Sequence, residues 1–212
     1  MVATLVSLLT FTGAAWGGYS LVLEPAVVNA DRPPYATVQV GGSIGLDGKG
    51  VAGVPVALRL DGPSRQLLAA DQVSTNQDGK FGTLLPLPVG TKSGTATLVA
   101  AAAGTVAQQQ VDIPLLPAAY YGSVKDASGQ NVASGKVEAY IEGRKAGEID
   151  FSNGFYGGSE GLAPKLVVSG TEADRGKPVV FKVNGILTTP NPSVVWQTGD
   201  VRRVDLTVTQ AK

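Results

Sequence analysis

The amino-acid sequence predicts an all-β protein built from two tandem antiparallel β-sandwiches that follow an apolar N-terminal segment. Three observations lead to this prediction: short apolar runs bounded by turn residues, the lack of a sustained helical period, and an internal repeat. The chain has 212 residues, of which 43% are hydrophobic. It is therefore long enough to form two domains with packed cores.

Residues 1–23 form the apolar N-terminal segment, because the first charged residue is Glu24. Their apolar run is shorter than the ~20 residues that a membrane-spanning helix needs. A secretory signal or anchor, an ordinary β-strand and a strand donated to a neighbouring subunit all fit this run. Small residues after the run favour the signal, whereas the absence of a preceding Lys or Arg opposes it. In an assembly role, the contact would be made by the apolar side chains of Val2, Leu5, Val6, Leu8, Leu9 and Phe11.

The rest of the chain alternates apolar and polar residues in short runs. This alternation predicts strands at residues 37–40, 54–60, 95–100, 136–141, 178–183 and 201–208. Dipeptides in which glycine follows Asp or Asn predict turns at Asp47-Gly48, Asp61-Gly62, Asp78-Gly79, Asn153-Gly154 and Asn184-Gly185. Alanines at residues 100–103 lie between glycines and follow β-branched residues, so we expect them to continue a strand.

An internal repeat divides the chain. The motif Gly42-Ser43-Ile44 returns as Gly122-Ser123-Val124, and the alternating run at residues 56–60 returns at residues 137–141. In the turn that follows, Phe155 is matched to Phe81, which predicts that Phe155 belongs to the core.

Two copies of one sandwich are the simplest interpretation of this repeat. We expect the first sandwich at residues 24–115 and the second at residues 117–212. Pro114 and Pro117 lie at the connection and stiffen it, because proline fixes φ and cannot donate to a strand ladder.

The residues between Gly42 and Phe81, with the order G-S-[IV]…V-A-G-V-P-V…T-N-Q-D-G-K-F, resemble the carboxypeptidase-regulatory-like and bacterial Ig-like modules. The second copy, residues 121–208, is similar to repeats of prokaryotic secreted and surface-layer-associated proteins. The similarity rests on its Val183-Asn184-Gly185 turn and its late Trp196-Gln197-Thr198-Gly199-Asp200. The resemblance implies Ig-like or transthyretin-like sandwiches that act as spacers, stalks, or adhesive and assembly units at the cell surface.

Composition removes several kinds of chemistry. The chain has no His and no Cys, which excludes Ser-His-Asp and Cys-His nucleophilic sites and thiolate or imidazole zinc sites. Ser123 and Lys125 are predicted to share one strand face, but no motif indicates an oxyanion hole beside them. We therefore expect no enzyme activity, no cofactor and no metal. A formal net charge of zero also argues against a nucleic-acid partner.

Aromatic residues in the second copy suggest a different function, carbohydrate binding. Sugar-binding sandwiches expose planar rings, and Trp196 and Tyr156 are the candidates for such a platform. A glycan is then the partner to test.

The function that the sequence favours is that of a non-enzymatic extracellular structural protein, a surface-layer, filament, stalk or adhesion subunit. It would act through sandwich packing and edge-strand pairing, with other copies or other surface proteins as partners. A phage or virion structural protein is a further alternative, because it would use the same surfaces without export.

Overall fold

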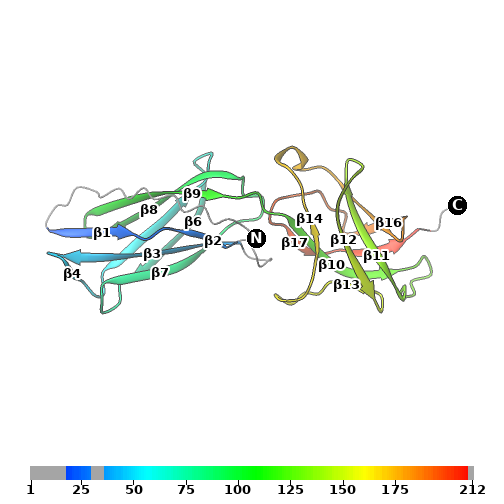
Figure 1. The fold of residues 1–212 in the computed structure, drawn as a ribbon, viewed down its shortest axis with the longest axis horizontal. Helices are drawn as coiled ribbons and strands as arrows, with labels where there is room; N and C mark the ends of the chain where they lie inside the picture. Colours follow the sequence, from blue (N-terminus) through cyan, green and yellow to red (C-terminus); the bar gives the residue numbers. More distant parts are fainter. Residues whose placement is uncertain (1–17, 30–35, 210–212) are drawn as a thin grey trace. The chain divides into compact units, whose positions relative to one another are not determined.

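The computed structural model describes residues 18–29 and 36–209 (Figure 1). The described residues form β-strands, turns and one short 3₁₀ helix at Glu172–Asp174, which confirms the all-β prediction. The chain divides into two compact units between Pro114 and Leu115. Unit 1 denotes the described residues up to Pro114, and unit 2 the residues from Leu115 onward. No helix in the described part is long and apolar enough to cross a membrane.

Unit 1 contains two sheets. In the first, β3 (Thr37–Leu46) is central and pairs with β1 (Tyr19–Leu23), β2 (Val27–Asn29), β4 (Lys49–Gly50) and β7 (Lys80–Pro86). The second has the order β6-β5-β8-β9, formed by β6 (Leu67–Ser74), β5 (Pro55–Asp61), β8 (Gly94–Ala102) and β9 (Thr105–Ile113).

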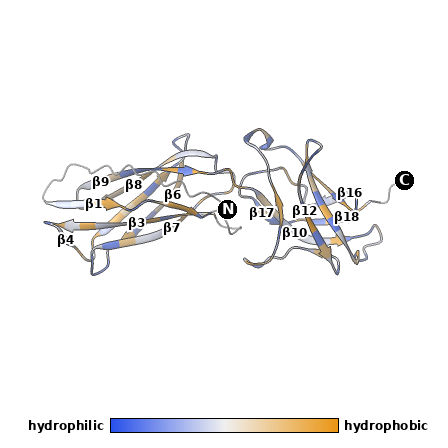
Figure 2. Cartoon of the chain, viewed as in Figure 1, coloured by the Kyte–Doolittle hydropathy of each residue, from blue (hydrophilic) through white to orange (hydrophobic). Residues whose placement is uncertain are grey.

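Both sheets of unit 1 contribute to one hydrophobic core. Alternate residues of β5, namely Val56, Leu58 and Leu60, are buried together with Val38 and Ile44 of β3. The apolar residues that recur at every second position in the sequence therefore lie on one face of the strand, the face that packs in the core. Figure 2 shows hydrophobic and hydrophilic residues interleaved along these strands.

Unit 2 contains the remaining strands. They are β10 (Ala118–Lys125), β11 (Ser134–Ile141), β12 (Arg144–Ser152), β13 (Phe155–Tyr156), β14 (Leu166–Val168), β15 (Val179–Val183), β16 (Ile186–Asn191), β17 (Val201–Arg203) and β18 (Asp205–Val208). Each run that the sequence predicts as a strand overlaps an observed strand, although the run at 201–208 is interrupted at Val204.

Seven strands of unit 2 close into a ring, which differs from the antiparallel β-sandwich that the sequence predicts. The order β13-β12-β11-β15-β16-β18-β10 returns to β13, because β10 pairs with β13 as well as with β18. The β10–β18 pairing is parallel, with Val124 opposite Leu206. A parallel neighbour that is distant in the sequence leaves no turn signal, so the pattern of residues could not reveal this closure.

Hydrogen bonds show where the internal repeat holds. The backbone N–H of Ile44 donates to the Gly79 carbonyl at 2.8 Å, and the N–H of Val124 donates to the Gly154 carbonyl at 2.8 Å. In the same way, Gly42 pairs with Phe81 across the β3–β7 ladder, and Gly122 pairs with Tyr156 across the β10–β13 ladder. Phe81 therefore corresponds to Tyr156.

That register corrects the prediction for Phe155. Its equivalent in unit 1 is Lys80, which pairs with Ser43 as Phe155 pairs with Ser123. Phe155 is 53% exposed, whereas Tyr156 is fully buried. The two neighbours lie on opposite faces because successive side chains of a strand alternate.

Candidate functional site

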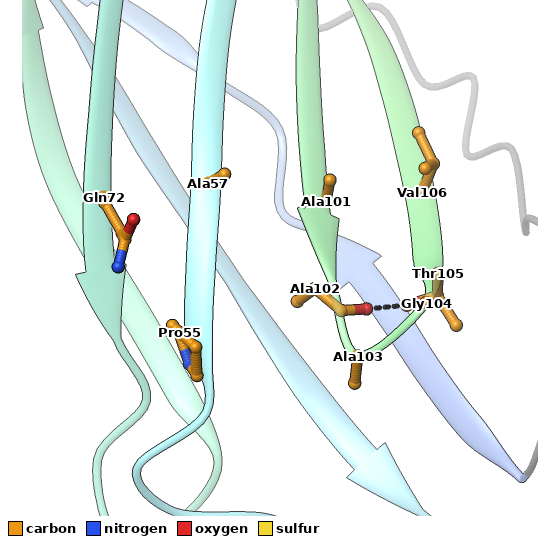
Figure 3. A pocket seen from close by; sticks show the side chains of 9 residues that line it. All are labelled: Pro55, Ala57, Gln72, Ala101, Ala102, Ala103, Gly104, Thr105 and Val106. Atoms are coloured by element: carbon orange, nitrogen blue, oxygen red, sulfur yellow. Dashed lines mark hydrogen bonds between the residues drawn. The ribbon is translucent and has the colours of Figure 1, made fainter.

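Unit 1 has a shallow concavity of about 450 Å³ on the outer face of the β6-β5-β8-β9 sheet (Figure 3). Ala57 and Ala101, which are register partners on adjacent strands, belong to its lining together with Pro55, Gln72 and Val106. The hydroxyl of Thr105 donates to the Ala102 carbonyl at 2.7 Å and fastens the β8–β9 turn beside it. None of the lining side chains is ionisable, so this surface offers packing and no acid–base chemistry.

Unit 2 has a concavity of about 520 Å³ with a different character. Its lining side chains are mostly polar or charged: Ser123, Lys125, Asn131, Phe155, Asn191, Arg203, Asp205 and Thr207. We call it the polar concavity. On β10, the side chains of Ser123 and Lys125 lie on the face opposite to that of Val124, which packs in the core. On β18, Asp205 and Thr207 flank the buried Leu206 in the same way. Alternation on the adjacent strands β10 and β18 thus places Ser123, Lys125, Asp205 and Thr207 on the outside of the ring.

Asp205 is the best-anchored group of the polar concavity. Its Oδ1 accepts the backbone N–H and the hydroxyl of Ser123, each at 2.8 Å. Arg203 Nε lies 3.1 Å from both carboxylate oxygens. Partial burial by itself would raise the pKa of Asp205, but the hydrogen bonds from Ser123 and the Arg203 charge outweigh it and hold this pKa below its ordinary value. The carboxylate is therefore ionised at neutral pH.

Four other lining side chains are not used by the fold. Within the described part of the chain, Lys125, Asn131, Asn191 and Thr207 make no side-chain hydrogen bond or ion pair. Two cations and one carboxylate line the concavity, so its charge is positive. Lys125 can donate to a ligand, and the amides and the hydroxyl can donate or accept, without breaking a side-chain hydrogen bond of the described residues.

The hydroxyl of Ser123 is directed to Asp205 at 2.8 Å, and Lys125 lies two residues further along the same strand face. Ser123 is only 5% exposed and directs its hydroxyl to Asp205, and no hydrogen bond or ion pair joins Ser123 to Lys125 in the described part of the chain. Among the described residues there is no group of three or more His, Cys, Asp or Glu side chains that could hold a metal ion.

Trp196 and Tyr156, the predicted carbohydrate platform, do not reach the surface. Both are fully buried. The Trp196 indole N–H donates to the Val168 carbonyl at 2.9 Å, and the Tyr156 hydroxyl donates to the Val204 carbonyl at 2.6 Å. Burial, reinforced by the Asp205 charge, raises the pKa of Tyr156. The prediction was wrong because large aromatic residues with one polar atom also serve as core residues when that atom finds a partner.

The predicted assembly residues lie outside the described residues. These are Val2, Leu5, Val6, Leu8, Leu9 and Phe11.

Phe155 is misplaced in the opposite sense to Trp196 and Tyr156, because the sequence predicts it in the core and it is 53% exposed. The signal that could have found it is the Asn153-Gly154 turn, in which both residues have positive φ. A two-residue turn of this kind fixes the parity of the strand after it, so a repeat aligned on the turn matches Tyr156 to Phe81.

Comparison with known proteins gives only distant likenesses. No protein-family model matches the chain, and no curated protein matches its sequence. Among solved structures, it is similar to invasin, a bacterial integrin-binding protein, with 16% identity and a TM-score of 0.32 over 86% of this chain and 39% of invasin. It is also similar to a mutant of Salmonella alpha-2-macroglobulin, with 14% identity and a TM-score of 0.33 over 93% of this chain and 15% of that protein. The chain thus spans less than half of either protein, and these scores assign it to no family.

Proposed function

We propose that the chain is a non-enzymatic extracellular structural protein, a surface-layer, filament, stalk or adhesion subunit, which assembles by packing of its β-units and pairing of edge strands. The observation that carries this proposal is the edge strand β6. In the described part of the chain, β6 pairs only with β5. Its outer row of backbone donors and acceptors is then available to another strand.

β6 lacks the protection that edge strands usually carry. Residues 67–74 contain neither Lys nor Pro, whereas the edge strand β7 of the other sheet has Lys80 and Pro86. The one charged side chain of β6, Asp71, accepts the Thr83 hydroxyl at 2.8 Å and so is tied to β7. A register shift beside Leu60 affects only the start of the strand, and residues 69–73 pair regularly with residues 56–60.

The apolar run of the N-terminal segment supplies the proposed partner strand. If this run pairs as a strand, its alternation would put Val6 and Leu8 on one face and Leu5 and Leu9 on the other, and the run contains no Lys, Glu or Pro. A strand donated by a second copy would satisfy both its own backbone and the free edge of β6. The formal net charge of zero lets copies approach without long-range repulsion.

The interior supports a structural role as well. Among the described residues, every buried side-chain nitrogen and oxygen has a hydrogen-bond partner within the protein. In unit 2, Tyr120 donates to Asp200, and Arg202 pairs with the same carboxylate at 2.8 Å. Burial, followed by the Asp200 charge, raises the pKa of Tyr120, so this phenol stays protonated. These polar groups join strands to one another.

Sedimentation velocity of the full chain over a range of concentrations tests the proposal. We expect the sedimentation coefficient to rise with concentration, and we expect Gln72→Lys on β6 and Val6→Asp in the N-terminal run each to suppress that rise. Gln39→Lys is the matched control, because Gln39 is exposed on the central strand β3. A chain that remains monomeric throughout would overturn the assembly mechanism.

A phage or virion structural protein would use the same surfaces, but it would not be exported and would therefore keep its N-terminal segment. Intact mass of the protein from its natural source separates the two: cleavage between Ala14 and Gly18 indicates export, whereas retention of Met1 supports a virion component.

A further inference from the structure

We infer that the polar concavity of unit 2 binds a saccharide that carries a carboxylate, a pyranose of the uronic-acid type. This inference does not depend on self-association, because none of the lining residues belongs to β6 or to the N-terminal segment.

The positive charge of the concavity selects an anionic ligand. Lys125 has no ion pair within the described part of the chain, and its register partner is the uncharged Thr207. Arg203 uses Nε for Asp205, which leaves the other guanidinium N–H groups for a ligand, and its side chain is 59% exposed. A ligand carboxylate between these cations would accept charge-assisted hydrogen bonds, the strongest kind that a solvated site offers.

Phe155 gives the concavity an apolar wall. It pairs with Ser123 across the β10–β13 ladder and is more than half exposed. A pyranose presents a face of C–H groups, while its hydroxyls project around the ring, so that face can pack against the phenyl ring. Unit 1 has Lys80 at the equivalent position and therefore lacks this wall.

Polar side chains that could serve as partners of sugar hydroxyls line the same concavity as the aromatic ring. Asn131 and Asn191 each offer an amide donor and acceptor, and Thr207 offers a hydroxyl. Among the described residues, Asp205 Oδ2 accepts only from Arg203, so it retains lone pairs for a ligand hydroxyl. The concavity thus holds an anion-binding side, an apolar wall and neutral hydrogen-bonding groups together.

The strand pairing argues against an acidic peptide as the ligand. An extended peptide binds a sheet by adding a strand to a free edge. At the concavity, β10 is paired on one side with β13 and on the other with β18, so it has no edge to offer. Side chains, not backbone groups, face the ligand here.

Titration of the ¹⁵N-labelled full chain by NMR tests the inference. The probes are D-glucuronate, its neutral methyl ester, D-glucose, acetate and a capped Asp-Glu peptide. We expect D-glucuronate to shift the amide signals of Ser123, Phe155 and Thr207, while the methyl ester, glucose and acetate bind at least about tenfold more weakly.

Two variants and a control locate the site. Phe155→Ala should weaken D-glucuronate binding about tenfold, and Lys125→Gln should reduce the preference for glucuronate over its methyl ester, with Arg203 supplying what remains. Leu187→Ala is the matched control, because Leu187 of β16 is 55% exposed and lies outside the concavity. Folding of each variant is read from the same spectra.

Three results would overturn the inference. The first is no shift at the concavity with D-glucuronate, and the second is equal binding of glucuronate and its methyl ester by the unsubstituted chain. The third is a stronger response of the same amides to the acidic peptide than to the sugar.

Discussion

Ser123 donates its backbone N–H and its hydroxyl to the same oxygen, Asp205 Oδ1, at 2.8 Å each. The two residues lie on β10 and β18, which are adjacent and parallel in the ring of unit 2. This contact fastens a strand pair that no short turn connects. It also fixes the position of the carboxylate in the polar concavity.

Asp205→Asn should lower stability at neutral pH by about 1 kcal/mol, because the amide cannot replace the ionic contact with Arg203 and the carboxylate is partly exposed. The lowered pKa of Asp205 in the fold means that its stabilising effect is present above the ordinary value of 3.8 and is lost as the pH falls through the folded pKa. Urea unfolding at several pH values should show the two proteins converging in acid. A difference that stays constant down to strongly acidic pH would contradict this assignment.

Substitution of Tyr156 should lower the free energy of unfolding much more than substitution of its neighbour Phe155. Tyr156→Phe removes a buried hydroxyl from the Val204 carbonyl at 2.6 Å and should cost about 1–3 kcal/mol of unfolding free energy. Phe155→Ala removes a mostly exposed ring and should change it by no more than about 0.5 kcal/mol. Equilibrium denaturation measures both, and the reverse order of costs would show that the parity of β13 is wrong.

Gly122 permits a close approach of backbones in unit 2. A Cβ on this residue would lie 2.1 Å from the Val204 carbonyl oxygen, which also accepts the Tyr156 hydroxyl. Gly122→Ala should therefore destabilise the protein by about 1–3 kcal/mol. Gly82→Ala is the control, because a Cβ there meets only the Val40 carbonyl at 3.5 Å. Thermal unfolding compares the two, and equal melting temperatures would count against the described junction of β17 and β18.

Trp196 should behave as a core residue in solution. In a Trp16→Phe background it is the remaining tryptophan, since the chain has two. Its full burial and its hydrogen bond to Val168 should give blue-shifted fluorescence with little quenching by acrylamide. Emission and quenching like those of free tryptophan would restore Trp196 as a surface platform.

The sequence predicts the features that depend on neighbouring residues, such as the buried face of a strand and the conformation of a two-residue turn. Alternation identifies the buried faces of β5 and β11, where Val56 and Val137 lie at matching positions of the two units. Both residues of the Asn184-Gly185 turn have positive φ, as a two-residue hairpin requires. Neither residue of Asp61-Gly62 does, because that loop extends to Gln66, whose carbonyl accepts the Gly62 N–H at 2.8 Å.

The features that escape the sequence depend on pairing between distant segments. Lys125 and Thr207 become neighbours only through the parallel ladder of β10 and β18. The polar concavity combines these strands with Asn131 from a loop and Asn191 from the end of β16. No spacing in the sequence connects such residues. Whether Phe155 or Tyr156 is the exposed residue depends on the register of β13, and a shift of one residue would exchange them.

Amide hydrogen exchange of the full chain at low and high protein concentration tests the proposed assembly most directly. If copies pair at the edge of β6, the alternate amides of residues 69–74 that point away from β5 gain protection as concentration rises, and Gln72→Lys removes that gain. Exchange at these amides that is the same at every concentration, in a sample that self-associates, would contradict edge-strand pairing at β6.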